Sequence, residues 1–362
     1  MNKHLFTTYQ LGGVTLKNRI LMAPMTRSRA IGNLPNAMIA KYYGQRASAG
    51  LIISEGVAPS ANGLGYTNTP GIFTPEQVNE WKQVTHQVHK SGGRIFAQLM
   101  HSGRIAHQSN LPTGGVVLAP SAVPANGQIW TKDGMIDFSR PKAMSVAEVQ
   151  NTTKEYVEAA KNAIEAGFDG VELHGANGYL LEQFLSPFSN LRTDEYGGSV
   201  ENRSRFVIET VVAVSAAIGA DKVGIRFSPY SAYNDMPAYS ETSDTYLHLA
   251  SKLNEIGIAY LHIVENSDGL IPVSLKKEIG KRFTQTIILA GNYTRERAED
   301  DIKSGLANLI AFGRPFINNP DLVTRFRNNW PLADNLDAST FFSSDEKGFV
   351  DYQPYLETAI LV

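Results

Sequence analysis

Residues 145–174 read SVAEVQNTTKEYVEAAKNAIEAGFDGVELH and encode one helix followed by one strand. Ser145 and Glu148 form a capping box, which predicts that the helix begins at Val146, and Gly167 predicts its end. The run 170–174 is short and largely apolar, as in a strand buried on both faces. One helical face carries the apolar stripe, which comprises Val149, Thr153, Tyr156, Ala160, Ala163 and Ile164. This segment therefore predicts one unit of an α/β protein.

The same alternation of short apolar runs and longer amphipathic stretches extends along the rest of the chain. Most of the short runs are apolar throughout, which is typical of parallel strands. The candidate strands are 20–23, 51–55, 94–99, 170–174, 223–228, 259–264, 286–290 and 308–312. The further candidate helices are 75–91, 201–218, 244–256, 273–283, 295–304 and 315–328.

About eight strand–helix pairs in this order predict a single (β/α)8 barrel domain over residues 1–362, because right-handed crossovers close such a series into a ring. An open, doubly wound sheet is the alternative, although no G-x-G-x-x-G motif follows the first strand. Such barrels take about 250 residues, so the chain also contains additions. We expect a hairpin over 9–19 that closes the barrel floor, a long insert or lid over about 102–143 after the third strand, and an irregular tail over about 330–362.

The composition excludes several classes of protein. The 33 basic and 35 acidic residues give a net charge of −2, so no electrostatic signature of nucleic-acid or membrane binding is present. The absence of cysteine excludes disulfides, thiolate metal sites and iron–sulfur clusters. The chain begins without a signal-peptide pattern and contains no apolar run of about 18 residues. We therefore expect a cytoplasmic protein.

Residues at the carboxyl ends of the candidate strands should form the active site, because the strands of a barrel end at one face. Glycines and Arg314 after the last two strands suit a phosphate, since backbone N–H groups and a guanidinium can both bind an anion. The strand-end residues are Pro24, Met25, Thr26, Arg27, Glu55, Gly56, Gln98, His101, His174, Asn177, Tyr179, Arg226, Gly291, Asn292, Gly313 and Arg314.

These residues lack the groups that several common barrel chemistries require. No three metal ligands converge, so no metal site is predicted. Glycoside hydrolysis needs two carboxylates, of which only Glu55 is well placed, and no lysine ends a strand to form a Schiff base. His262, inside a strand, is interpreted as a core histidine. Neutral donors and acceptors beside a phosphate site suit a flat organic cofactor that performs the chemistry itself.

Residues 174–187, HGANGYLLEQFLSP, resemble the old yellow enzyme family of FMN-dependent ene reductases. The similarity continues through 190–203, NLRTDEYGGSVENR, and recurs in shorter blocks at 18–27, 98–104 and 311–315. The resemblance implies a barrel that binds FMN, oxidises NAD(P)H and reduces activated C=C bonds in enones, enals and maleimides, with nitro compounds or nitrate esters as further candidates. It leaves open NADH or NADPH, and a monomer or a homodimer.

The resemblance also implies roles for individual residues. His174 and Asn177 would donate hydrogen bonds to the substrate oxygen, and Tyr179 would protonate the α-carbon as general acid. Thr26 would contact the flavin carbonyl beside N5, and Arg226 would contact its pyrimidine edge. The full set of implied cofactor-binding residues is Pro24, Met25, Thr26, Gly56, Gln98, Arg226, Gly291, Asn292, Gly313 and Arg314.

Three further residues are predicted to line the substrate pocket. Tyr66 is expected at its mouth. Met100 stands where relatives often carry an indole, which favours a wider substrate range. Phe342 stands where many carry a tyrosine, so a hydroxyl contact is not expected there.

A flavin-binding protein without catalytic activity is the alternative function, and the intact residues of the 174–179 segment favour the enzyme. Iron–sulfur dienoyl reductases share the barrel but need cysteines that this chain lacks.

Overall fold

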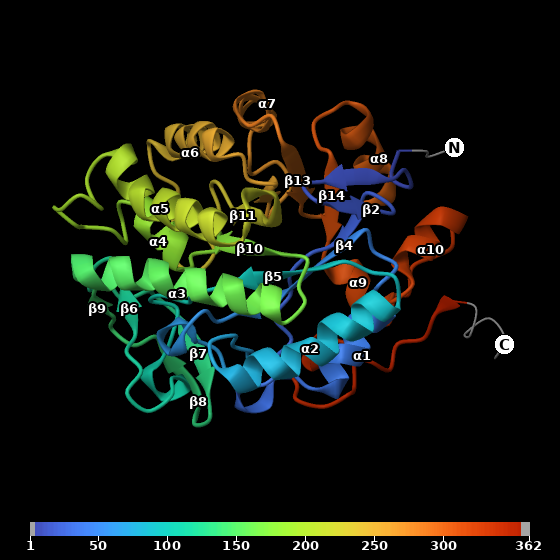
Figure 1. Cartoon of the computed structure of the whole chain (residues 1–362), viewed down its shortest axis with the longest axis horizontal. Helices are drawn as coiled ribbons and strands as arrows, with labels where there is room; N and C mark the ends of the chain where they lie inside the picture. Colours follow the sequence, from blue (N-terminus) through green and yellow to red (C-terminus); the bar gives the residue numbers. More distant parts are fainter. Residues whose placement is uncertain (1–3, 356–362) are drawn as a thin grey trace.

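A closed barrel of eight parallel strands forms the centre of the computed structural model, which describes residues 4–355 (Figure 1). Each strand pairs with the next in chain order, and the last pairs with the first, which confirms the (β/α)8 barrel and excludes the open sheet. The strands are β3 (Ile20–Met22), β4 (Leu51–Val57), β5 (Ile95–Leu99), β10 (Gly170–Gly175), β11 (Val223–Phe227), β12 (Tyr260–Val264), β13 (Thr286–Ala290) and β14 (Leu309–Phe312).

All eight predicted strands are confirmed, with boundaries that shift by two residues at most. Every residue of these strands is buried, which explains why the sequence shows continuous apolar runs rather than alternation. β4 contains an irregularity between Ile53 and Gly56, where its register to β5 shifts.

Helices cover the outside of the barrel, and the main hydrophobic core lies between the two layers. Trp81, Tyr156 and Phe206 contribute large buried side chains to this core. The capping boxes at Thr74 and Ser145 are both present. The helices are α1 (Ala37–Gln45), α2 (Pro75–Lys90), α3 (Val146–Glu165), α4 (Leu180–Leu185), α5 (Val200–Ile218), α6 (Thr242–Ile256), α7 (Val273–Arg282), α8 (Arg295–Lys303), α9 (Arg314–Asn318) and α10 (Leu322–Asn328).

The prediction of one helix over 315–328 is wrong, because the chain forms two helices, α9 and α10, on either side of Pro320. Proline lacks an N–H group and disfavours the helical conformation of the residue before it. Asn319 accordingly has φ −127° and ψ 82°. Two helices were not predicted: α1, which Asn36 caps, and α4, whose residues are all buried and therefore show no polar face.

An N-terminal hairpin closes one end of the barrel, as predicted. β1 (Tyr9–Leu11) and β2 (Val14–Leu16) pair antiparallel. Leu11 and Leu16 belong to the cluster inside the barrel that includes Leu51, Tyr260 and Leu309, the first residues of three strands. The hairpin therefore covers the amino-terminal end, and the carboxyl ends of the strands are at the opposite face.

The long insert after β5 contains only short elements. β6 (Leu118–Ala119) pairs with β9 (Lys142–Ala143), and β7 (Gln128–Thr131) forms a hairpin with β8 (Gly134–Asp137) at the lower edge of Figure 1. The insert contains no α-helix between residues 102 and 143. Its role as a lid stays a prediction. Short 3-10 helices cover Ile31–Asn33, Ala61–Gly63, Gln108–Asn110, Ala220–Lys222 and Ala338–Thr340.

The tail after α10 is irregular, and buried arginines bind it to the loop that follows β3. Arg27 donates to the backbone oxygens of Phe341 and Gly348. Arg29 donates to those of Thr340 and Phe341. These contacts fix residues 340–348 beside the carboxyl end of the first barrel strand.

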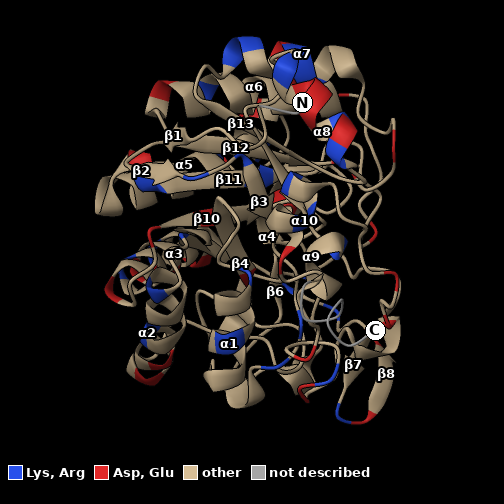
Figure 2. Cartoon of the chain, turned by 90° about the vertical axis from the view of Figure 1, so that its right-hand side faces the viewer, with Lys and Arg blue, Asp and Glu red and all other residues tan. Residues whose placement is uncertain are grey.

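Charged residues of both signs are interspersed on the outer helices, as α2, α7 and α8 show in Figure 2. Within residues 4–355, no helix combines the length and the apolar character needed to cross a bilayer.

Candidate active site

A buried polar network lies inside the barrel, below the face formed by the carboxyl ends of the strands. At its centre is Glu172 of β10, whose carboxylate accepts from Gln98 Nε2 and from His262 Nδ1, each at 2.8 Å. Burial lowers the pKa of His262, so a neutral imidazole makes this contact. His262 is a core histidine, although its Nε2 has no partner among the described residues.

Arg226 of β11 lies in register between His174 of β10 and His262 of β12. Its side chain is only 6% exposed, and its Nε has no hydrogen-bond partner in the described part of the chain. Burial lowers the pKa of Arg226, while the nearby Glu172 carboxylate opposes this effect. Buried N–H groups are almost always paired in folded proteins. Arg226 is therefore suited to bind an electron-rich group at the mouth of the barrel.

His174 lies next to Arg226 and is held in one neutral form. Its Nδ1 accepts from the backbone N–H of Ala176 at 3.3 Å, so the proton is on Nε2. Burial, with the nearby Arg226 and His262, lowers the pKa of His174 well below its usual value. The imidazole is thus a neutral donor through Nε2.

The strand β10 ends in a turn formed by residues 176–179, which we call the 176–179 turn. Asn177 and Gly178 both have positive φ, +57° and +77°. Asn234 Nδ2 donates to the backbone oxygen of Asn177 at 2.8 Å, and Asn266 Nδ2 donates to its side-chain oxygen at 3.2 Å. The amide nitrogen of the Asn177 side chain is left as a donor, as is His174 Nε2.

Tyr179, at the end of this turn, lies between His174 and Tyr66. Its ring centroid is 4.8 Å from that of His174, and its hydroxyl oxygen is 3.1 Å from that of Tyr66. Burial, followed by Tyr66, raises the pKa of Tyr179 well above its usual value, so the phenol stays protonated at neutral pH.

The structure brings Tyr66 and Met100 together with Tyr179, and their place in a substrate pocket stays a prediction. They share a small cluster with three residues of the insert that the sequence analysis missed, Ile105, Ala125 and Phe138. Periodicity could not identify them, because the insert has no regular pattern. Phe342 is not in this cluster: its side chain is 67% exposed and its ring lies beside that of Phe341. Its place in the pocket stays a prediction.

The other candidate cofactor residues lie at the strand ends around this centre. Pro24, Met25 and Thr26 follow β3 and are partly exposed. A Cβ atom at Gly56 would lie 2.6 Å from Met100 Sδ, so any larger residue there would require the Met100 side chain to move.

The predicted phosphate-binding residues follow two adjacent strands. Gly291 and Asn292 come after β13, and Gly313 and Arg314 come after β14. Since β13 and β14 pair directly, both glycine-containing turns leave the same part of the barrel rim. Asn292 and Arg314 are exposed there.

No group of three or more His, Cys, Asp or Glu that could hold a metal ion is found in residues 4–355. One histidine on the outer face, His89 of α2, contacts a single carboxylate: its Nε2 lies 2.9 Å from an oxygen of Asp169.

Comparisons with known proteins match the chain over most of its length. The model of the NADH:flavin oxidoreductase / NADH oxidase family matches residues 4–333. The chain is 41% identical to putative 12-oxophytodienoate reductase 11 of Oryza sativa subsp. japonica, covering 98% of each chain. Morphinone reductase in complex with tetrahydroNAD is 43% identical with a TM-score of 0.93, covering 96% of this chain and 97% of that one. An old yellow enzyme homologue from Zymomonas mobilis is 39% identical with a TM-score of 0.92, covering 96% and 99%.

Proposed function

Because the chain belongs to the NADH:flavin oxidoreductase / NADH oxidase family, that of the old yellow enzymes, we propose that it is an FMN-dependent ene reductase that oxidises NAD(P)H. Its proposed substrates are activated alkenes: enones, enals and maleimides, with nitro compounds or nitrate esters as further candidates. The observation that carries the proposal is the neutral His174 donor beside the protonated phenol of Tyr179.

The two donors, His174 Nε2 and the Asn177 amide, bind the carbonyl or nitro oxygen of the substrate. When a hydride adds to the β-carbon, negative charge moves to this oxygen. Fixed donors in a buried site stabilise that charge without reorganising, as in an oxyanion hole. Because the pKa of His174 is so low, the imidazole donates from its neutral form throughout the physiological pH range.

Tyr179 delivers the proton to the α-carbon, so that one hydride and one proton saturate the C=C bond. A phenol can act as a general acid only while it is protonated, and the raised pKa of Tyr179 keeps it so. Tyr66, whose hydroxyl lies 3.1 Å away, can donate to the phenolate oxygen that this step leaves. Since Tyr66 is partly exposed, it also links Tyr179 to solvent.

The residues present fit an FMN, which when bound supplies the hydride chemistry between NAD(P)H and the alkene. Arg226 is buried with an unpartnered Nε, and it would bind and stabilise the negative end of the isoalloxazine. Gln98 and Thr26 would bind the ring, with Pro24, Met25 and Gly56 beside them. The phosphate would be bound by Gly291, Asn292, Gly313 and Arg314.

The reductant is a nicotinamide nucleotide, NADH or NADPH. A morphinone reductase that shares 43% of its sequence with this chain has been described in complex with tetrahydroNAD, which supports this assignment.

Anaerobic turnover tests the proposal. The purified holoprotein is incubated with NADPH or NADH and 2-cyclohexenone, and both the nucleotide and the product are quantified. We expect one cyclohexanone for each nucleotide oxidised. A yellow protein that produces no reduced product from an enone, an enal, a maleimide or a nitro compound would instead be the flavin-binding protein without catalytic activity.

A further inference from the structure

We propose that Glu182 is a positioning residue whose carboxylate, buried beneath the 176–179 turn, holds Asn177 and Tyr179 in the orientation that the proposed reaction needs. The effect of Glu182 on catalysis rests on the proposed function, whereas its contacts with the turn do not. Glu182 is the third residue of α4, which begins directly after Tyr179, and its side chain is 5% exposed.

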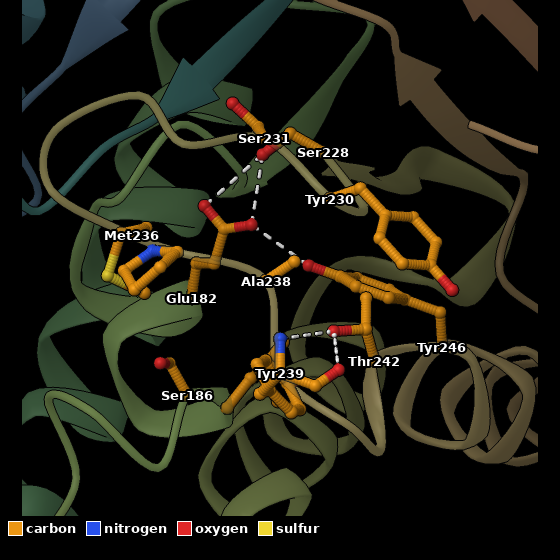
Figure 3. Close-up of a pocket in the computed structure, with 12 residues that line it drawn as sticks. Glu182, Ser186, Ser228, Tyr230, Ser231, Met236, Ala238, Tyr239, Thr242 and Tyr246 are labelled. Carbon is orange, nitrogen blue, oxygen red and sulfur yellow. Dashed lines mark hydrogen bonds between the residues drawn. The ribbon is translucent and has the colours of Figure 1, made fainter. Parts of the chain in front are cut away.

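The Glu182 carboxylate accepts hydrogen bonds from three directions. Its Oε2 accepts from the backbone N–H of Gly178 at 2.6 Å, and its Oε1 accepts from the Tyr246 hydroxyl at 2.9 Å. Ser228 Oγ lies 2.9 and 3.2 Å from the two oxygens. Figure 3 shows the contacts of the carboxylate with Ser228 and Tyr246. All three partners donate, so the contacts favour the ionised form of Glu182.

Ser228 extends the effect of the carboxylate to Asn177. The backbone N–H of Asn177 donates to Ser228 Oγ at 2.8 Å, and the Ser228 hydroxyl donates in turn to Glu182. One carboxylate therefore binds two successive N–H groups of the turn, one directly and one through a hydroxyl. Successive N–H groups that converge in this way form an anion-binding concavity.

The opposite side of the turn is fixed by another segment. Asn234 binds the backbone oxygen of Asn177, and a Cβ atom at Gly178 would lie 2.7 Å from Cβ of Asn234. The turn is thus held between residues 233–236 and Glu182. Left-handed φ is uncommon for a residue other than glycine, so Asn177 depends on such contacts to keep its conformation.

The charge of Glu182 can change near neutral pH. Burial raises its pKa to about 7, although Gly178, Tyr246 and Ser228 oppose this. A further titratable group that faces it is Tyr239, and the Arg203 guanidinium lies 5.5 Å from the centre of the Tyr239 ring. Tyr239 and Tyr246 stay neutral, because burial also raises their pKa values. A cavity of about 20 Å³ beside the carboxylate could accommodate one water molecule.

The test compares three holoenzyme variants with the wild type in 2-cyclohexenone reduction from pH 6 to 8. Glu182→Leu removes every acceptor and should lower kcat at least tenfold at pH 8 without changing flavin content. In the wild type, kcat should decrease as the pH falls below 7 and Glu182 becomes protonated. Glu182→Gln retains an acceptor for Gly178 but cannot ionise, so its kcat should lack this decrease. Glu209→Gln is the matched control: Glu209 also accepts from a buried tyrosine, Tyr196, at 2.9 Å, but does not contact the turn.

Amide hydrogen exchange gives a second measurement that does not depend on activity. In Glu182→Leu, a peptide that covers residues 176–179 should exchange about tenfold faster than in the wild type, because the Gly178 N–H loses its acceptor and Ser228, which binds the Asn177 N–H, loses the carboxylate that holds it. Unchanged exchange, or an acid decrease that persists in Glu182→Gln, would overturn the inference. If Glu182→Leu does not fold, the pH profile of Glu182→Gln decides. If the wild type reduces no alkene, the proposed function fails, and hydrogen exchange still tests the positioning role.

Discussion

The hydroxyl oxygens of Tyr66 and Tyr179 lie 3.1 Å apart, in a cluster that also contains Met100 and residues of the insert. Two phenols from distant parts of the chain therefore share a hydrogen bond at the place where the proposed reaction needs a proton. Burial raises the pKa of both, that of Tyr66 to about 12. Both remain protonated at neutral pH.

Replacing Tyr179 by phenylalanine should separate the two half-reactions. The variant lacks the proton donor, so alkene reduction should fall by about 10²- to 10⁴-fold, the usual contribution of a general acid. Flavin reduction by NADPH needs no proton from Tyr179 and should stay near the wild-type rate. Stopped-flow absorbance measures both steps. Equal rates of alkene reduction in the two proteins would show that another group is the acid.

Tyr66→Phe should have a smaller effect that depends on Tyr179. It removes the partner of the phenol but leaves the acid itself, so we expect about a threefold to tenfold loss in kcat, the value of one neutral hydrogen bond. In the double variant Tyr66→Phe/Tyr179→Phe, no further loss should follow beyond that of Tyr179→Phe alone. Losses that multiply would mean that Tyr66 acts on the substrate independently.

His174 should act without changing its charge. Since burial holds its pKa well below the ordinary value, the substrate-reduction rate should show no step from imidazole titration between pH 6 and 8. His174→Ala should lower this rate by about 10²- to 10³-fold, as when one oxyanion-hole donor is removed. The measurement compares the substrate-reduction rates of the wild type and of His174→Gln across this pH range. An alkaline step in the wild type that is absent from His174→Gln would indicate a charged histidine.

Arg226→Met should weaken flavin binding more than it weakens the fold. The guanidinium is buried with an unpartnered Nε, and a hydrogen bond from a charged group contributes about 1.5–3 kcal/mol. The Kd for FMN should therefore rise about 10- to 100-fold in a fluorescence titration. Arg205→Met, on the outer helix α5, is the control and should bind FMN as the wild type does. Equal affinity in both variants would remove Arg226 from the cofactor site.

Glu55 should make the stability of the fold depend on pH. Burial raises its pKa from 4.5 to about 7, against the opposing effect of the Arg27 N–H group, so the folded state binds more protons than the unfolded state between these values. The contribution of Glu55 to the free energy of unfolding is complete below pH 4.5 and is lost as the pH rises through 7. It amounts to at most about 3 kcal/mol. Urea unfolding at pH 5 and pH 8 should show a smaller difference for Glu55→Gln than for the wild type. If the free energy of unfolding changed equally between pH 5 and pH 8 in both proteins, Glu55 would not be the source of the pH dependence.

The barrel could be predicted from the sequence because its strands are buried on both faces and its helices carry explicit end signals, as at Thr74 and Ser145. The prediction of one helix over 315–328 was wrong because the helix-breaking effect of Pro320 was overlooked; the proline divides this segment into two helices. His174 and Arg226 lie near the carboxyl ends of β10 and β11, so their place at this face of the barrel was predictable from the topology alone.

The supporting carboxylates could not be predicted. Glu172 lies inside a strand and Glu182 in a short helix with no exposed face, so neither differs in sequence from an ordinary polar residue. They stand out only through their contacts with Gln98, His262, Ser228 and Tyr246, which tertiary packing brings together.

The most direct test of the central claim mixes the anaerobically reduced holoprotein with 2-cyclohexenone in a stopped-flow spectrometer and follows the return of the yellow colour. We predict that the colour returns at a rate that saturates with enone concentration, because in the proposed function the substrate first binds to His174 and Asn177. A protein that stays bleached with the enone, an enal and a maleimide, and regains its colour only with oxygen, would contradict the account.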